Sequence, residues 1–356
     1  MHKVELQNLY KVFFPSQLAV NMALAGADPQ EIRRKTGGIL AVINANLTIN
    51  SGEIFVIMGL SGSGKSTLIR CINRLIEPSH GNVLIDGVNA TKLSASDLRD
   101  LRRHRVSMVF QNFALLPHKN VIENVEYGLA LRKDEKAKRR EKTLEMLSLV
   151  GLADWAEHYP DNLSGGMKQR VGLARALATD SEILIMDEPF SALDPLIRRD
   201  LQDELIKLQQ HLKKTIIFVT HDFHEAIRIG NRIAIMRHGK VVQSGSPQDI
   251  VFYPADEYVK RFSSDIDRSK IVKVSDIMQG VNAVNPTEAG GVSIHAHQSV
   301  AEVFPFLSST NVIRVLDNEG KICGALTLPD ILNFLASGQI QDSLNFQQPV
   351  TEALTA

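Results

Sequence analysis

The sequence predicts an α/β fold with a parallel sheet at its centre, followed by a second, smaller α+β domain. Three short apolar runs, at residues 54–58, 183–186 and 215–219, have the length and composition of strands that are buried on both faces. A helical pattern precedes each of the last two runs, as expected when helices connect parallel strands. The 356 residues are enough for one large domain and one small domain.

The composition is that of an ordinary soluble globular protein, with 44% hydrophobic and 22% charged residues. Lys plus Arg and Asp plus Glu both number 40, so no overall field draws the protein to nucleic acid or to an anionic membrane. Two distant cysteines, Cys71 and Cys323, do not predict a disulfide framework. We find no signal-peptide pattern and no window of about 18 continuous apolar residues, so transport would need a membrane domain on another chain.

The first fifty residues predict two strands and an insert between them. Alternating apolar residues mark strands at 3–10 and 42–49. The insert, residues 16–38, has a helical pattern punctuated by Pro29 and by two glycines at its end.

Residues 131–150 predict one charged helix. Its apolar face would contain Leu131, Leu144, Leu147 and Val150, behind a run of lysines, arginines and glutamates. We interpret the charge run as a solvent-facing helix surface.

A phosphate-binding loop follows the first apolar run. Residues 59–66, GLSGSGKS, match the pattern GxxxxGK[ST] and are followed by a sequence compatible with a helix. The glycines let backbone N–H groups face phosphate oxygens, with the positive end of the helix behind them. Lys65 would contact the β and γ phosphates, and the Ser66 hydroxyl can bind Mg²⁺. The alternative, a glycine-rich turn that only joins strand to helix, does not explain the lysine and hydroxyl. The expected nucleotide-binding residues are Gly59, Ser61, Gly62, Ser63, Gly64, Lys65, Ser66 and Thr67.

Two carboxylates follow the second apolar run. Asp187 and Glu188 emerge where the strand ends, at the edge where α/β sheets bind ligands. Asp187 is placed to hold Mg²⁺, and Glu188 is the candidate general base for the water that attacks the γ phosphate. Taken alone, such a pair is also a common helix cap.

Residues 163–167, LSGGM, resemble the LSGGQ-type motif of the ABC (ATP-binding cassette) family. Ser164 would cap a helix, and with Gly165 and Gly166 it would form a second anion cradle that contains no lysine. The resemblance implies a head-to-tail homodimer in which this cradle closes the ATP site of the other subunit. Met167 departs from the usual glutamine but leaves the serine and the glycines in place. The family fold combines a RecA-like parallel sheet, an antiparallel β subdomain and an α-helical subdomain.

Other positions of the ABC pattern follow in the expected order. By this resemblance Gln111 contacts Mg²⁺ and the attacking water, and Asp194, in the stretch 192–194, crosses the dimer. His221, directly after the third apolar run, would sense the γ phosphate. Standing alone, it would equally cap a strand end. Phe13 is the aromatic residue expected to stack on adenine, with Tyr10 and Phe14 as alternatives and a core role open for each.

Residues 1–262 resemble the ATPase subunits of glycine betaine/proline-type osmoprotectant importers. The resemblance rests on the end of the insert at 32–38, on the loop region 53–64 and on residues 190–198. It implies ATP and Mg²⁺ as cofactors and a quaternary amine or proline-like solute. It also implies membrane permease subunits, a solute-binding protein as an indirect partner, no nucleic acid, and a peripheral position on the cytoplasmic face of the inner membrane. A soluble ABC ATPase of the DNA-repair or translation type is the alternative, but those carry coiled-coil insertions or two fused cassettes. A phosphate-loop kinase would leave 164–167 and His221 unexplained.

The composition changes near 262–267, where we place the domain boundary. The predicted divisions are an ATP-binding domain at 1–265, a regulatory domain at 271–340 and a tail at 341–356. Residues 274–278 and 324–330 resemble the ends of a single CBS module. By that resemblance Thr327 and Asp330 would contact an adenosine ligand, although TxxD before an apolar helix is equally a capping box.

Overall fold

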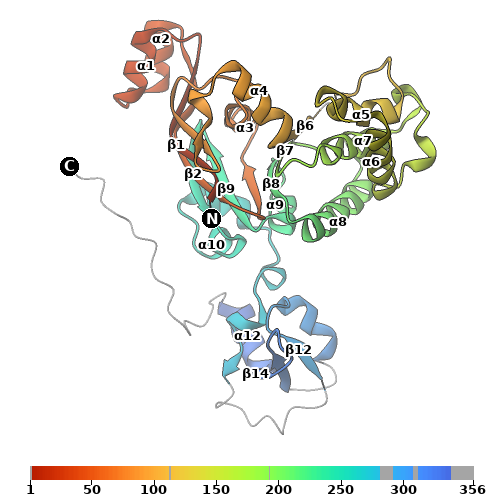
Figure 1. Cartoon of the computed structure of the whole chain (residues 1–356). Helices are drawn as coiled ribbons and strands as arrows, with labels where there is room; N and C mark the ends of the chain where they lie inside the picture. Colours follow the sequence, from red (N-terminus) through yellow and green to blue (C-terminus); the bar gives the residue numbers. More distant parts are fainter. Residues whose placement is uncertain (1, 112–113, 192, 281–291, 308–311, 338–356) are drawn as a thin grey trace. The chain divides into compact units, whose positions relative to one another are not determined.

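The computed structural model describes residues 2–111, 114–191, 193–280, 292–307 and 312–337 (Figure 1). The chain forms two compact units, Met1–Pro247 and Gln248–Ala356. The predicted tail at 341–356 lies outside the described residues. Among the residues that are described, no helix is both long enough and apolar enough to span a bilayer.

The first unit contains the predicted sheet of buried parallel strands. The six-stranded sheet has the order β10-β9-β3-β8-β7-β6, with β10 antiparallel to β9 and the other neighbours parallel. Every residue of β3, β7 and β8 is buried, as the apolar runs predicted. The strands are β3 (Ile54–Met58), β6 (Val106–Val109), β7 (Ile183–Asp187), β8 (Thr215–Thr220), β9 (Arg232–Arg237) and β10 (Lys240–Gly245).

A second, antiparallel sheet packs against the same core in the order β2-β1-β4-β5. Its first two strands are those predicted from alternation, but each is longer than its predicted range. Helix α3 (Lys65–Ile72) contributes Leu68, Ile69 and Ile72 to the core that the two sheets share. The strands are β1 (His2–Phe13), β2 (Ile39–Asn50), β4 (His80–Ile85) and β5 (Val88–Asn89).

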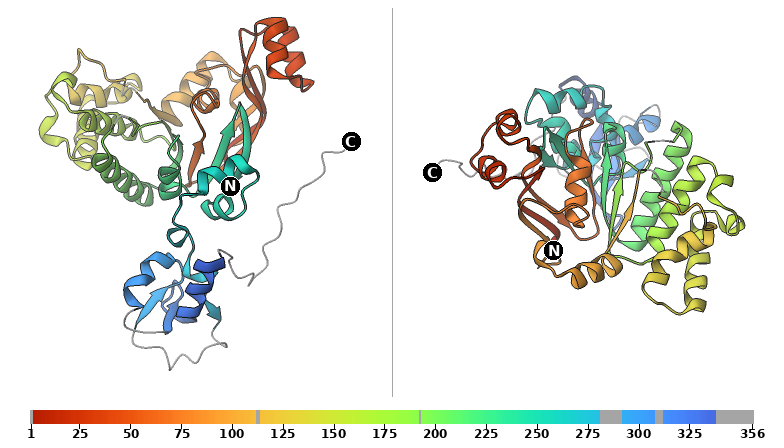
Figure 2. Two further views of the ribbon diagram at one scale, coloured as in Figure 1. Left: turned by 180° about the vertical axis from the view of Figure 1, so that it is seen from behind. Right: turned by 90° about the horizontal axis from the view of Figure 1, so that it is seen from above.

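The insert forms two helices, α1 (Gln17–Leu24) and α2 (Pro29–Thr36), at one end of β1 and β2 (Figures 1 and 2). The chain turns between them because Gly26 adopts a φ of 77° and the Asp28 side chain caps α2 by accepting from Gln30 and Glu31. Val12 of β1 packs with Ala19, Ala23 and Ile32 in a small core of their own.

A helical lobe lies on the other side of the six-stranded sheet (Figure 1). It contains α5 (Val121–Leu131), α6 (Lys136–Leu149) and α7 (Gly165–Ala178). The single helix predicted at 131–150 is wrong at its start, because the chain leaves α5 and Lys133 adopts a left-handed φ of 64° before α6. Leu147 and Val150 are buried as predicted, whereas Leu131 is 50% and Leu144 42% exposed.

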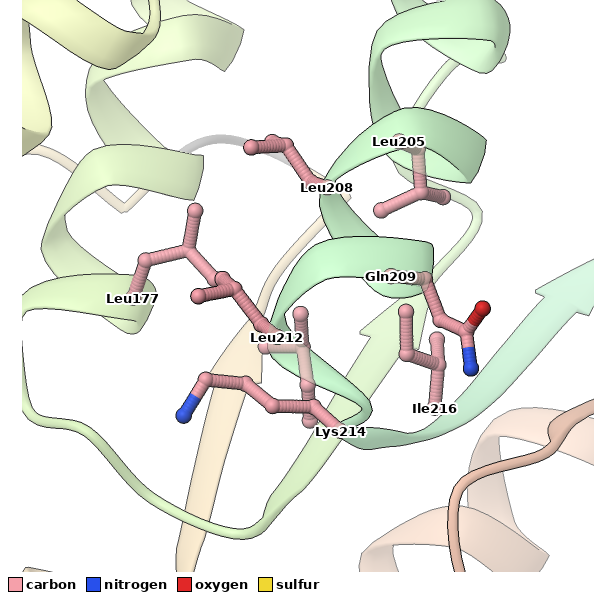
Figure 3. Close-up of a pocket in the computed structure, with 8 residues that line it drawn as sticks. Leu177, Leu205, Leu208, Gln209, Leu212, Lys214 and Ile216 are labelled. Atoms are coloured by element: carbon pink, nitrogen blue, oxygen red, sulfur yellow. The ribbon is translucent and has the colours of Figure 1, made fainter.

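Helix α8 (Pro195–Leu212) shares an apolar contact with α7, β7 and β8. Leu177 of α7 and Leu205 and Leu208 of α8 line a cavity of about 10 Å³ (Figure 3). A space of that size holds at most one water molecule, so this apolar contact is not a ligand site. The remaining helices of the unit are α4 (Ala95–His104), α9 (Phe223–Ile229), η1 (Ala90–Lys92), η2 (Ala153–Trp155) and η3 (Pro160–Asn162).

The second unit is a small α+β fold with its own apolar core. Its sheet has the order β11-β14-β13-β12, and Gln248 Nε2 donates to Asp276 Oδ2 at 2.7 Å. Phe252 also packs against this core, so the two helices before the predicted boundary group with the second unit. Its elements are α10 (Pro247–Phe252), α11 (Glu257–Ser263), η4 (Arg268–Lys270), η5 (Val274–Asp276), β11 (Gln279–Gly280), β12 (Ser293–His295), η6 (Val300–Phe306), β13 (Val312–Leu316), β14 (Ile322–Thr327) and α12 (Leu328–Ser337).

Candidate active site

The site lies at the carboxyl edge of the six-stranded sheet. Strand β8 pairs in parallel with both β3 and β7, so the segments that follow these three strands lie beside one another. They are the phosphate loop after β3, the acidic pair at the end of β7 and His221 after β8. The topology therefore gathers residues that are more than a hundred positions apart in the sequence.

The phosphate loop requires glycine at its two ends. Gly59 has a φ of 150°, and a Cβ there would lie 2.2 Å from the carbonyl oxygen of Met236. Gly64 has a φ of 102°, and its Cβ would lie 2.3 Å from the carbonyl oxygen of Ala41. Gly64 directly precedes α3 and has no side chain to cap the helix, which leaves the first N–H groups of α3 available to an anion.

The Lys65 ammonium is held inside this loop. Its Nζ donates to the carbonyl oxygens of Gly59 at 2.8 Å and Leu60 at 3.2 Å, and lies 3.6 Å from Glu188 Oε1. The side chain is only 4% exposed. Burial lowers the pKa of Lys65 below its ordinary value, and the Glu188 carboxylate offsets part of that effect. Lys65 is thus a buried cation at the place where the sequence predicts phosphate.

Two side chains whose oxygens could bind a metal ion lie together beside the phosphate loop. Ser66 Oγ donates to Asp187 Oδ1 at 2.8 Å, and Asp187 is only 1% exposed. A hydroxyl and a carboxylate are ligands that Mg²⁺ accepts, so these residues fit the predicted ion. Gln111 lies just beyond the end of β6 and is exposed. Sequence reasoning missed Arg70, whose Nη2 donates to Asp187 Oδ2 at 3.0 Å. Its position four residues after Ser66 on the same helix was the available signal.

Glu188 and His221 lie close together at the same edge of the sheet. Glu188 Oε2 lies 3.2 Å from His221 Nδ1, while its other oxygen faces Lys65. The Glu188 side chain is 16% exposed and His221 is 56% exposed. Glu188 N donates to Val219 O at 3.1 Å, which ties the candidate base to the end of β8. A carboxylate between a buried cation and an open imidazole can accept a proton from water that enters from the exposed side.

Ser164 and Asp194 cap two neighbouring helices. Ser164 Oγ accepts from Met167 N at 3.3 Å, and Asp194 Oδ1 accepts from Ile197 N at 3.1 Å. A Cβ on Gly166 would lie 2.9 Å from Ile197 Cγ2, so the second glycine of the motif also permits α7 and α8 to approach closely. Ala192, in the same stretch as Asp194, lies outside the described residues.

The three aromatic candidates differ in their surroundings. Phe13 is partly buried at the end of β1, with Lys11 Nζ 5.2 Å from its ring centroid. Tyr10 packs against the small core of the insert and makes an edge contact with His80 at 6.1 Å between ring centroids. Phe14 is 77% exposed. Tyr10 and Phe13 are both partly buried and Phe14 is exposed, so all three rings retain exposed surface.

In the second unit, Thr327 and Asp330 bond to each other as a helix cap. Asp330 Oδ2 accepts from Thr327 N at 2.9 Å and from Thr327 Oγ1 at 2.6 Å. Asp330 Oδ1 accepts from Gln279 Nε2 at 2.8 Å. The capping-box alternative explains these contacts without a ligand.

Comparison with known proteins places these features in a family. The model of a family described as ABC transporter matches residues 42–191. The glycine betaine transport ATP-binding protein OpuAA of Bacillus subtilis is 46% identical over 345 residues, which are 96% of this chain and 81% of OpuAA. The glycine betaine/proline betaine transport system ATP-binding protein ProV of Escherichia coli is 54% identical over 77% of this chain and 69% of ProV.

The fold of the first unit is also similar to that of a solved ATP-binding cassette. The ATP-binding cassette MJ0796, in a dimeric post-hydrolysis state bound to ADP and Pi, superposes with a TM-score of 0.59 at 35% identity. The match covers 68% of this chain and 98% of MJ0796. The relatives named here are transport proteins, which favours the importer prediction over a soluble repair or translation ATPase.

Proposed function

Because this chain belongs to the ABC transporter ATP-binding proteins, in the group of glycine betaine and proline betaine transport subunits, we propose that it hydrolyses ATP to drive import of a quaternary amine osmoprotectant. One observation carries the proposal. The edge formed by β3, β7 and β8 brings the Lys65–Glu188–His221 group beside the Ser66–Asp187 pair. A phosphate-binding loop, a candidate base and a metal-binding pair in one place are what ATP hydrolysis requires.

The loop residues bind the phosphates. The N–H groups at the start of α3 and between Gly59 and Gly64 provide the cradle, with Ser61, Ser63 and Thr67 in or beside it. Lys65 would exchange its contacts with the loop carbonyls for contacts with the β and γ phosphates. Phe13 would stack on the adenine.

Glu188 acts as the general base. One of its oxygens is held near Lys65 and the other near His221, so its orientation is defined before the nucleotide arrives. His221 keeps the base in position and contacts the γ phosphate from the exposed side. Glu188 then accepts the proton of the attacking water.

Ser66, Asp187 and Gln111 would hold Mg²⁺, because their hydroxyl, carboxylate and amide oxygens suit that ion. When bound, the ion would neutralise charge on the β and γ phosphates of ATP. Asp187 is already held in place by Ser66 in this structure.

A second copy of the chain completes the site. Ser164, Gly165 and Gly166 of the partner subunit would close over the γ phosphate, with Asp194 at the dimer contact. The helix start they form is an anion cradle without a lysine, which suits a nucleotide already held by Lys65 of the other copy. That MJ0796 forms a dimer in a post-hydrolysis state supports this arrangement.

The dimer would act on membrane permease subunits from the cytoplasmic face of the inner membrane. ATP binding brings the two copies together and hydrolysis separates them, which moves the permease between its two states. The solute would be a quaternary amine such as glycine betaine, proline betaine or choline, or proline, selected by an aromatic cage in a separate binding protein. Residues 271–340 would be a CBS-like regulatory domain.

Reconstitution tests this function. The chain is purified with its cotranscribed membrane subunits, placed in lipid vesicles with the binding protein, and assayed for ATP hydrolysis against a set of solutes. Glycine betaine or a related quaternary amine should stimulate hydrolysis and accumulate in the vesicles. Hydrolysis that no quaternary amine or proline stimulates, or a chain that does not associate with the permease, would contradict the proposal.

A further inference from the structure

Asp187 is a buried carboxylate whose two oxygens have different partners. Only 1% of its side chain is exposed. Ser66 Oγ donates to Oδ1 at 2.8 Å and Arg70 Nη2 donates to Oδ2 at 3.0 Å. Both partners come from α3, and Asp187 is the last residue of β7. The carboxylate is therefore fixed in rotation by two contacts to one helix.

Lys65 attracts the Asp187 carboxylate electrostatically, and the Arg70 guanidinium is the cation that hydrogen-bonds to it. An ionised carboxylate that is removed from water is destabilised unless an opposite charge and hydrogen bonds compensate it. Ser66 supplies a hydrogen bond but no charge, while the Arg70 guanidinium supplies both. The Arg70 side chain is itself 42% exposed, so it extends from the surface to a buried partner, Asp187.

We propose that Arg70 is a positioning residue for the magnesium site: it holds Oδ2 of Asp187 so that Oδ1 stays directed at Ser66. The inference rests on the proposed function, because it concerns the ion that accompanies ATP. Arg70 acts through Asp187 and needs no contact with the nucleotide. It is a partner of a metal ligand, of the kind that fixes ligand orientation in metal sites.

Loss of Arg70 would affect the metal before the nucleotide. Without the guanidinium, Oδ2 loses its donor and the buried carboxylate loses the cation that is hydrogen-bonded to it, so Oδ1 is held toward Ser66 less firmly. Replacing such outer partners typically weakens metal binding by about 10- to 100-fold. The phosphate loop and Lys65 are unchanged, so binding of ATP without metal should persist.

The test measures nucleotide binding by the full-length chain with a fluorescent ATP analogue, first in EDTA and then across a Mg²⁺ titration. Arg70→Gln removes the charge, and Arg70→Lys keeps the charge but not the planar fork. Arg103→Gln is the matched control, because Arg103 is 43% exposed and lies 3.6 Å from Asp100, which is 62% exposed. The Arg103–Asp100 ion pair joins the same two residue types as the Arg70–Asp187 pair, but both of its side chains are exposed.

For Arg70→Gln we expect affinity in EDTA within about twofold of the unmodified chain and a half-saturating Mg²⁺ concentration raised about 10- to 100-fold. Arg70→Lys should lie between this variant and the control. A merely structural role would instead weaken binding in EDTA and in Mg²⁺ alike. Unchanged Mg²⁺ dependence in Arg70→Gln, or equal losses with and without Mg²⁺, would overturn the proposal.

Two further outcomes are also decisive. If Arg70→Gln does not fold, Arg70→Lys decides the question, and a Mg²⁺ requirement equal to that of Arg103→Gln would overturn the proposal. If the unmodified chain binds no ATP at all, with or without Mg²⁺, the proposed function itself fails. Failure of the proposed function is distinguishable from failure of the Arg70 proposal, because it is seen in the unmodified chain.

Discussion

Glu188 occupies an unusual backbone conformation at the end of β7. Its φ of 45° is in the left-handed region, which costs a residue with a side chain of order 1–3 kcal/mol. Surrounding hydrogen bonds hold it there, since its N–H donates to Val219 O at 3.1 Å and Ser191 Oγ donates to its carbonyl at 3.0 Å. With this backbone conformation, the Glu188 carboxylate lies near both Lys65 and His221.

Replacing Glu188 with Gln should lower ATP turnover by about 10²- to 10⁴-fold, because the amide cannot accept the proton from water. ATP binding should remain, since the phosphate loop is unaffected. The measurement is steady-state ATP hydrolysis beside nucleotide binding. Glu145→Gln is a suitable control, because Glu145 is 60% exposed and pairs with Lys142 on the surface. Hydrolysis in Glu188→Gln at the level of this control would rule out Glu188 as the base.

The elements of the site could be predicted where their signals are local. The buried strands, the phosphate loop and the acidic pair each depend on a few consecutive residues, and the structure gathers Lys65, Ser66, Asp187, Glu188 and His221 at one edge. The Arg70 contact was missed because no motif marks it, although Arg70 lies one helical turn after Ser66, which binds the same carboxylate. The break at Lys133 and the division of the predicted helical insert into two helices were not predicted, because periodicity does not show where a left-handed residue interrupts a helix.

The contact between α7 and α8 gives a prediction about stability. Gly166→Ala should lower the free energy of unfolding by about 1–3 kcal/mol, because its Cβ would lie 2.9 Å from Ile197 Cγ2. Gly165→Ala is the matched control, since its Cβ would lie at an ordinary 3.8 Å from Leu193 Cδ2. Urea denaturation of both variants measures the difference. Equal stability of the two would show that the second glycine is not required by packing.

At the scale of the whole chain, the candidate catalytic residues all belong to the first unit. The last of them, His221, precedes the end of that unit at Pro247. The second unit has its own core and its own sheet, and we propose a regulatory role for it. The anion cradle at Ser164 contains no lysine, and we assign it to the nucleotide of a partner copy.

A chain that ends at Pro247, where the first unit ends, should therefore retain ATP hydrolysis. Its response to salt or to nucleotides should change if residues 271–340 are regulatory. Hydrolysis is measured over a range of ionic strengths for the full-length and shortened proteins, with circular dichroism to confirm folding. Complete loss of hydrolysis in a folded shortened protein would show that the second unit contributes to catalysis.

The composite site is the central claim, and mixed dimers test it most directly. Lys65→Ala removes the phosphate-binding charge of a site, and Ser164→Arg places bulk and charge in the cradle that closes the other site. Dimers that combine one subunit of each variant have both defects in one site and neither in the other. Purified mixed dimers should occlude one ATP, whereas either variant alone should occlude none. Folded mixed dimers that occlude no nucleotide would contradict the shared-site account.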